Sequence, residues 1–172
     1  AHFDSKERLF EAVVRSLAGS VVLTLTASEV ALRPSLISFA VALRNRVLSP
    51  RAIGVYRTLV AEAPRFPKLA KLIYALGQEA AQHALANFLV KHMRDGRLRK
   101  SDPQFAAQMF MNMTFGHERG RLLYGVSVSK SGERRRVEQI VDCFLSAFAT
   151  EGSEMASIQH IQTRRNRGEA HA

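Results

Sequence analysis

The sequence has no tryptophan and contains only one cysteine, three tyrosines and five prolines among 172 residues. Because the single Cys143 cannot form an internal disulfide, a disulfide-stapled secreted scaffold is excluded. The scarcity of tyrosine and tryptophan argues against a surface that stacks sugars or RNA bases. Low proline and glycine with 47% hydrophobic residues is typical of one helical domain with a single buried core.

Motifs for catalysis and metal binding are also missing. There is no His-Glu-x-x-His, no glycine-rich phosphate loop and no set of Cys and His with zinc-site spacing. Glu79 and His83 are the nearest approach to a metal-bundle motif, but they are four residues apart and unmatched elsewhere. The sequence therefore predicts a protein that is not an enzyme and that needs no metal or cofactor.

Long hydrophobic runs are absent as well. The longest uncharged stretches, such as the one from Ser16 to Ser28, are too short to span a bilayer, and no cleavable signal is visible. We therefore expect a cytoplasmic protein without a membrane partner.

The net charge of +10 would suit a partner that carries phosphates. Lys and Arg, however, are spread over residues 44–46, 91–100, 134–136 and 164–167, mostly at expected helix ends and connections. Such clusters are usually solvated faces, so the charge predicts a general attraction to DNA and no additional DNA site.

The apolar residues recur at helical spacing along most of the chain. Ser35 is expected to cap a helix, Pro50 to begin another, and the prolines at 64 and 67 to break the chain. The only strand-like alternation, Val126 to Ser129, lies in a connection. The sequence therefore predicts an all-α fold, with helices over residues 5–25, 35–49, 50–63, 67–76, 81–95, 103–124 and 133–149.

The first ten residues read as the end of one helix, a tight turn and the capped start of the next. Asp4 or Ser5 can accept hydrogen bonds from the first turn of the following helix. The pattern His-Phe, Ser-Lys-Glu and Leu-Phe between His2 and Phe10 resembles the junction that closes the helix-turn-helix of TetR-family transcriptional regulators. Residues 50–67, with Tyr-Arg and Ala-Glu-Ala-Pro-Arg-Phe-Pro, resemble a stretch of one group of TetR C-terminal domains.

This resemblance implies three segments: the end of a mostly missing helix-turn-helix DNA-binding domain at 1–4, a helical ligand-binding and dimerisation domain at 5–150, and a polar tail or frayed helix at 151–172. It also implies that His2 and Lys6 meet DNA phosphates, which position a protein without reading sequence. The implied function is a transcriptional regulator, most simply a repressor. Its operator binding would depend on a small, largely apolar ligand that moves the helix starting at Ser5.

Methionine and aromatic residues are concentrated between positions 105 and 115, and such a mixture suits an irregular apolar cavity or a plain core. His92 and His117 fall on otherwise apolar faces and could orient a ligand beside Tyr74 and Glu118. The predicted ligand-binding residues are Phe66, Tyr74, Phe88, His92, Met109, Met113 and His117.

The last predicted helix carries a wide apolar stripe. Such a stripe could dock on the protein's own core, whereas the TetR resemblance implies that the last two main helices pair across a twofold axis in a homodimer. The predicted interface residues are Leu123, Val137, Ile140, Val141, Phe144, Leu145 and Phe148.

Two other functions stay open at this point. A helical protein–protein interaction module would use the same stripe for a different partner, and the absence of a symmetric homodimer would favour it. A helical enzyme acting on a hydrophobic substrate would need a perturbed titrating group in a cavity, together with turnover.

Overall fold

The computed structural model describes Leu25 and residues 31–150, and every regular element in that part of the chain is helical. His2, Lys6, the predicted first helix except Leu25, and the predicted tail lie outside the described residues. The all-α prediction is confirmed for the described part, whose only strand-like pairing is an isolated bridge between Leu98 and Ala149. In chain order the elements are α2 (Leu32–Val47), α3 (Pro50–Glu62), α4 (Pro67–Tyr74), η1 (Ala75–Glu79), α5 (Ala80–Arg94), α6 (Pro103–Met111), η2 (Asn112–Gly116), α7 (His117–Leu123) and α8 (Glu133–Phe148).

Capping side chains and prolines set two of the helix starts. The Ser49 side chain accepts a hydrogen bond from the Ala52 amide at 3.2 Å, directly before Pro50. Asp102 accepts from the Gln104 amide at 2.8 Å, directly before Pro103. A proline in the first turn costs nothing there, because that N–H would have no helical acceptor. Both starts agree with the sequence prediction.

The expected cap at Ser35 is wrong. Helix α2 begins at Leu32, and Ser35 is buried inside its first turn, where its hydroxyl donates to the Ala31 carbonyl at 2.7 Å. Pro34 does not stop this helix, since a proline in the first turn removes no helical hydrogen bond.

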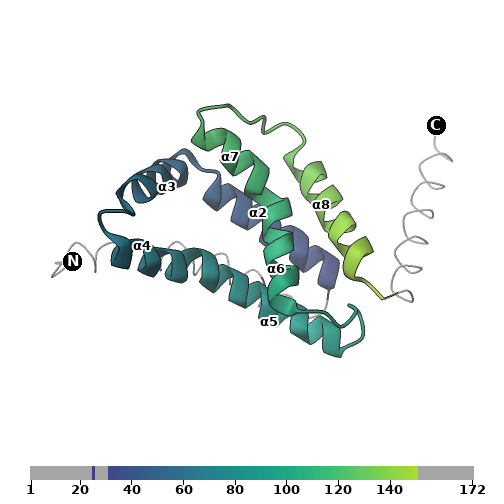
Figure 1. Cartoon of the computed structure of the whole chain (residues 1–172). Helices are drawn as coiled ribbons and strands as arrows, with labels where there is room; N and C mark the ends of the chain where they lie inside the picture. The colour runs from purple at the N-terminus through teal and green to yellow at the C-terminus, as the bar shows by residue number, and fades with distance from the viewer. Residues whose placement is uncertain (1–24, 26–30, 151–172) are drawn as a thin grey trace, which may run out of the picture.

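Two π-helical segments join neighbouring helices into long rods. Segment η1 connects α4 to α5, and η2 connects α6 to α7, so the chain is helical from Pro67 to Arg94 and again from Pro103 to Leu123 (Figure 1). A π turn accommodates an extra residue and shifts the faces on either side of it relative to each other. The two helices predicted over residues 67–76 and 81–95 therefore belong to one continuous helical rod.

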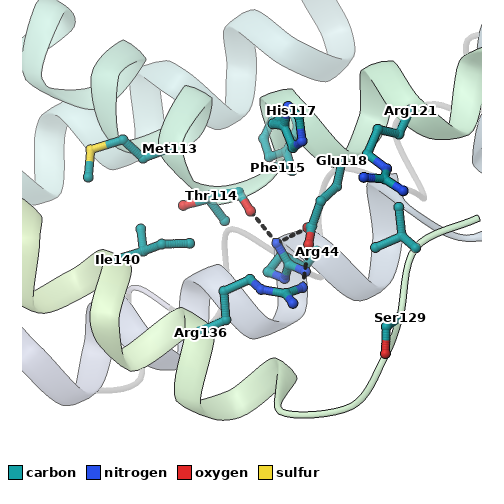
Figure 2. A pocket seen from close by; sticks show the side chains of 11 residues that line it. Arg44, Met113, Thr114, Phe115, His117, Glu118, Arg121, Ser129, Arg136 and Ile140 are labelled. Carbon is teal, nitrogen blue, oxygen red and sulfur yellow. Dashed lines mark hydrogen bonds and ion pairs between the residues drawn. The ribbon is translucent and has the colours of Figure 1, made fainter.

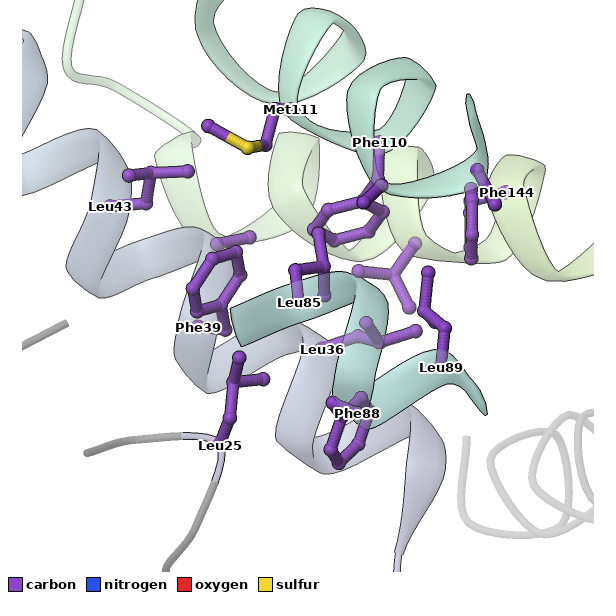
Figure 3. Close-up of a cluster of buried hydrophobic side chains, with 14 of the residues drawn as sticks. Leu25, Leu36, Phe39, Leu43, Leu85, Phe88, Leu89, Phe110, Met111 and Phe144 are labelled. Carbon is purple, nitrogen blue, oxygen red and sulfur yellow. The ribbon is translucent and has the colours of Figure 1, made fainter. Parts of the chain in front are cut away.

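The core lies where α2, α5, α6 and α8 meet. Helix α5 packs against α6, and α2 packs against α8. The Phe110 ring centroid lies 5.0 Å from that of Phe144 and 6.4 Å from that of Phe39. Figure 3 shows this cluster with Leu25 at its edge, close to Phe39 and Phe88. The apolar faces of α2, α5, α6 and α8 thus pack against one another within a single protomer.

This packing corrects part of the predicted dimer interface. Val137, Val141, Phe144 and Phe148 are buried in the protomer's own core, with 8% exposure or less. They are therefore not available to a second copy, and this face of α8 docks on its own protomer. Ile140 and Leu145 are half-buried, as is Leu123 at the end of α7.

Helix α8 is fastened along its length by polar contacts. Arg33 donates to both carboxylate oxygens of Asp142, at 2.7 and 3.0 Å, which joins α2 to α8. At the end of α8, the Arg99 amide donates to the Phe148 carbonyl at 2.8 Å, and the Thr150 hydroxyl donates to the Gly96 carbonyl at 2.9 Å. The turn after α5 and the end of α8 thus form one unit.

None of the helices in the described part of the chain is both long enough and apolar enough to cross a membrane.

Candidate functional site

A cleft of about 410 Å³ opens between α2, η2, α7, the connection after α7 and the first half of α8. This volume is within the range of small-molecule sites, which is about 300–1,000 Å³. Figure 2 shows side chains from α7 and η2 on one side and from α2 and α8 on the other pointing into the cleft. The lining residues are Arg44, Met113, Thr114, Phe115, His117, Glu118, Arg121, Val128, Ser129, Arg136 and Ile140.

Arg44 forms the inner wall of the cleft and is only 2% exposed. Its guanidinium donates to the Thr114 carbonyl at 2.5 Å and to the Glu133 carboxylate at 3.2 Å. The same group forms an ion pair with Glu118. One side chain therefore connects α2, η2, α7 and α8. A buried arginine is tolerated only when its donors are satisfied in this way.

Glu118 is the centre of the charged cluster. One carboxylate oxygen contacts Arg44, and the other accepts a hydrogen bond from Arg136 at 2.5 Å. The Glu118 side chain is 12% exposed, whereas the Arg136 side chain is 40% exposed. The carboxylate thus bridges a buried guanidinium and one at the mouth of the cleft.

The two ends of the cleft differ in chemistry. Met113 and Ile140 lie together at one end (Figure 2). At the other end, exposed Arg121 donates to the Ser127 carbonyl at 3.2 Å. The cleft is therefore apolar at one end and positively charged at the other.

The structure brings only two of the predicted ligand-binding residues into this cleft, namely Met113 and His117. Phe66, Tyr74 and Met109 are on the surface, with 47%, 49% and 39% of each residue exposed. They do not line the cleft.

Phe88 and His92 form a separate buried pair on α5. Their ring centroids are 4.6 Å apart in an edge-on contact, and His92 is 3% exposed. Among the described residues, the buried His92 Nδ1 atom has no hydrogen-bond partner. Burial, followed by the nearby charge of Arg97, lowers the pKa of His92. A neutral imidazole is therefore favoured at this position.

Sequence reasoning missed Arg44 and Arg136, because it assigned both arginine clusters to solvated faces. That assignment is wrong for Arg44, which is buried. A signal was present in the sequence. Arg44 follows Ala40 by four residues and therefore lies on the apolar face of α2, where an unpaired charge would not be stable.

Helix α3 is attached to the wall of the cleft by two arginines. Arg57 donates to the carbonyls of Leu122 at 2.5 Å and Leu123 at 3.1 Å, which fits the preference for positive charge at a helix C-terminus. The Arg119 guanidinium lies 5.0 Å from the Tyr56 ring and 4.9 Å from the Phe115 ring. A displacement of α7 would therefore also displace α3.

Across residues 31–150 and Leu25, no group of three or more His, Cys, Asp or Glu side chains lies close enough together to hold a metal ion.

Solved structures share this arrangement of helices. A protein of Mesorhizobium loti MAFF303099 assigned to the TetR family of transcriptional regulators has a TM-score of 0.76 and 24% identity, over 87% of this chain and 78% of its own. The flavonoid-responsive regulator FrrA has a TM-score of 0.71 and 27% identity over the same shares. The architecture is thus that of TetR-family regulators. None of the curated proteins matches the sequence.

Residues 34–150 match the family model described as "AefR-like transcriptional repressor, C-terminal domain". The chain belongs to this family and therefore contains the C-terminal domain of a TetR-family transcriptional regulator, as the resemblance predicted.

Proposed function

We propose that the protein is a homodimeric repressor whose operator binding is controlled by a small molecule held in the helical domain. The observation that carries the proposal is the cleft, whose inner wall is cross-linked by Arg44 and whose α7 wall is joined to α3 by Arg57. The family description "transcriptional repressor" supports the direction of control.

Control would operate by a shift between two conformations. A ligand changes an equilibrium only if it binds one state more tightly than the other. A ligand that separates α7 from α8 would move α3 through Arg57 and would disturb the core cluster in which Leu25 lies. Leu25 belongs to the segment preceding α2, so such a change would alter the spacing of two DNA-binding heads. Those heads must stand about 34–36 Å apart to enter successive major grooves.

The full-length regulator and the DNA flanking its own gene provide the test. We expect a bound ligand to raise the Kd for that DNA at least tenfold, within the usual range of allosteric coupling. Octanoate and the flavonoid naringenin are suitable probes, the second because FrrA is flavonoid-responsive. Fluorescence anisotropy with labelled DNA measures the Kd, and calorimetry establishes that each probe is bound. An unchanged Kd with the probe bound contradicts ligand control.

Dimerisation would use apolar side chains that are exposed on the described part of the protomer. Phe105 is 53% exposed and Met109 is 39% exposed, one turn apart on α6. Exposed apolar side chains at this spacing form a stripe that a second copy can bury. Together with half-buried Leu145 on α8, they replace the buried residues of the predicted interface.

Replacing Phe105 and Met109 together with glutamate should convert the dimer to a monomer, because four like charges would meet across a twofold axis. Sedimentation equilibrium measures the mass. Val60→Glu, at a 57% exposed position on α3, is the matched control and should remain dimeric. A double variant that dimerises as tightly as wild type would exclude α6 from the interface. Phe144→Glu is unsuitable for this test, since the Phe144 ring is in the core.

A further inference from the structure

The charged cluster of the cleft contains more positive than negative groups. The guanidinium groups of Arg44, Arg121 and Arg136 are opposed by the carboxylates of Glu118 and Glu133, which leaves one positive charge. A site that holds one extra positive charge is complementary to a single anionic group.

The unused donors are at the mouth of the cleft. Arg44 directs its Nε and one Nη to protein groups, and Glu118 is occupied by two arginines. In contrast, Arg136 uses one nitrogen for Glu118, and Arg121 uses one for the Ser127 carbonyl. Within the described residues, Arg121 has no carboxylate partner. Both side chains therefore keep N–H groups for an acceptor from outside the protein.

The remainder of the cleft fits an apolar body. Met113 and Ile140 lie beyond Arg136, on the side opposite Arg121 (Figure 2). Methionine adapts its shape readily to an irregular apolar group. A ligand that occupied the whole cleft would thus meet arginines with one end and aliphatic side chains with the other.

We propose that this cleft binds a small amphipathic carboxylate, whose carboxylate is held by Arg121 and Arg136 and whose apolar body lies against Met113 and Ile140. The inference deepens the proposed function by naming the ligand class. It refines the sequence prediction of a largely apolar ligand, because the arginines select a charged end. The control of operator binding rests on the proposed function, whereas carboxylate binding at the cleft is independent of it.

The test compares octanoate with 1-octanol, which has the same chain length but no charge. Calorimetry on the whole 172-residue chain should show one octanoate bound per protomer, with a Kd about tenfold lower than that of 1-octanol. Arg121→Gln should raise the octanoate Kd about tenfold and leave the 1-octanol Kd unchanged. Arg121 is exposed, so the variant should keep the wild-type circular dichroism spectrum.

Arg135→Gln is the matched control, because Arg135 neighbours Arg136 on α8 but does not line the cleft. It should bind octanoate as wild type does. Ile140→Ser should weaken octanoate and 1-octanol by the same factor, since it removes apolar contact alone.

Two outcomes would overturn the assignment: wild-type protein that binds octanoate no better than 1-octanol, or Arg121→Gln that binds octanoate as tightly as wild type. Operator release is measured separately. Arg121-dependent octanoate binding that leaves operator affinity unchanged would therefore support the site while contradicting ligand control.

Discussion

Replacing Glu118 with alanine should lower the free energy of unfolding by about 3 kcal/mol, as is typical when one partner of a buried ion pair is removed. Arg44 is 2% exposed and would lose its shortest ionic partner, keeping only Glu133 and the Thr114 carbonyl. Water cannot easily solvate the orphaned charge at that depth. Urea denaturation followed by circular dichroism at 222 nm measures the change.

Glu138→Ala is the control for the loss of a glutamate. Glu138 pairs with Arg134, whose side chain is 79% exposed, and such surface pairs contribute about 0.5 kcal/mol. The double variant Arg44→Met with Glu118→Leu should be more stable than Glu118→Ala, since it removes the buried charge with its partner. If Glu118→Ala and Glu138→Ala are equally destabilised, the charged cluster is not a buried cross-link.

Phe110→Ala should destabilise the fold by about 4 kcal/mol, within the range for aromatic truncation in a core. The residue is completely buried and its ring lies between those of Phe39 and Phe144, so truncation leaves a cavity where three helices meet. The same denaturation experiment at a fixed protein concentration measures the loss.

Tyr124→Ala serves as the aromatic control, because Tyr124 is 90% exposed at the end of α7. Its effect should be within about 0.5 kcal/mol of zero, as for most surface substitutions. A Phe110→Ala loss no larger than that of Tyr124→Ala would mean that the cavity collapses or that the cluster is not the core.

Helix positions were predictable where local chemistry decides them. The pairs Ser49-Pro50 and Asp102-Pro103 each combine a capping side chain with a proline in the first turn, and both helices begin there. Ser35 misled the prediction because serine is a common helix cap, whereas the helix begins earlier, at Leu32, and Pro34 is acceptable in its first turn.

The role of the α8 stripe was not predictable from periodicity. An apolar face is needed equally for docking on a protomer's own core and for docking on a second copy. Only the three-dimensional packing shows that Phe144 meets Phe110 within one protomer. Dimer formation through Phe105 and Met109 stays a prediction.

The composition of the cleft was harder to predict, for a geometric reason. Met109 and Met113 are four residues apart on one continuous helical rod, yet Met109 is exposed on the surface whereas Met113 lines the cleft. The ion pairs of Arg44 join residues 74 and 89 positions apart, distances over which spacing carries no information.

The unequal fastening of α8 determines how that helix can respond to a molecule in the cleft. A backbone hydrogen bond from Arg99 to Phe148 and a hydrogen bond from the Thr150 hydroxyl to Gly96 hold its Phe148 end to the turn after α5. Its Glu133 end is joined to α2 and α7 by the side-chain pairs Arg44–Glu133 and Arg136–Glu118. If α8 tilted, it would accordingly pivot near Ala149, and the largest displacement would occur at the end beside Arg44 and Arg136. A molecule that neutralises charge at the Glu133 end of α8 would therefore affect the orientation of this helix most.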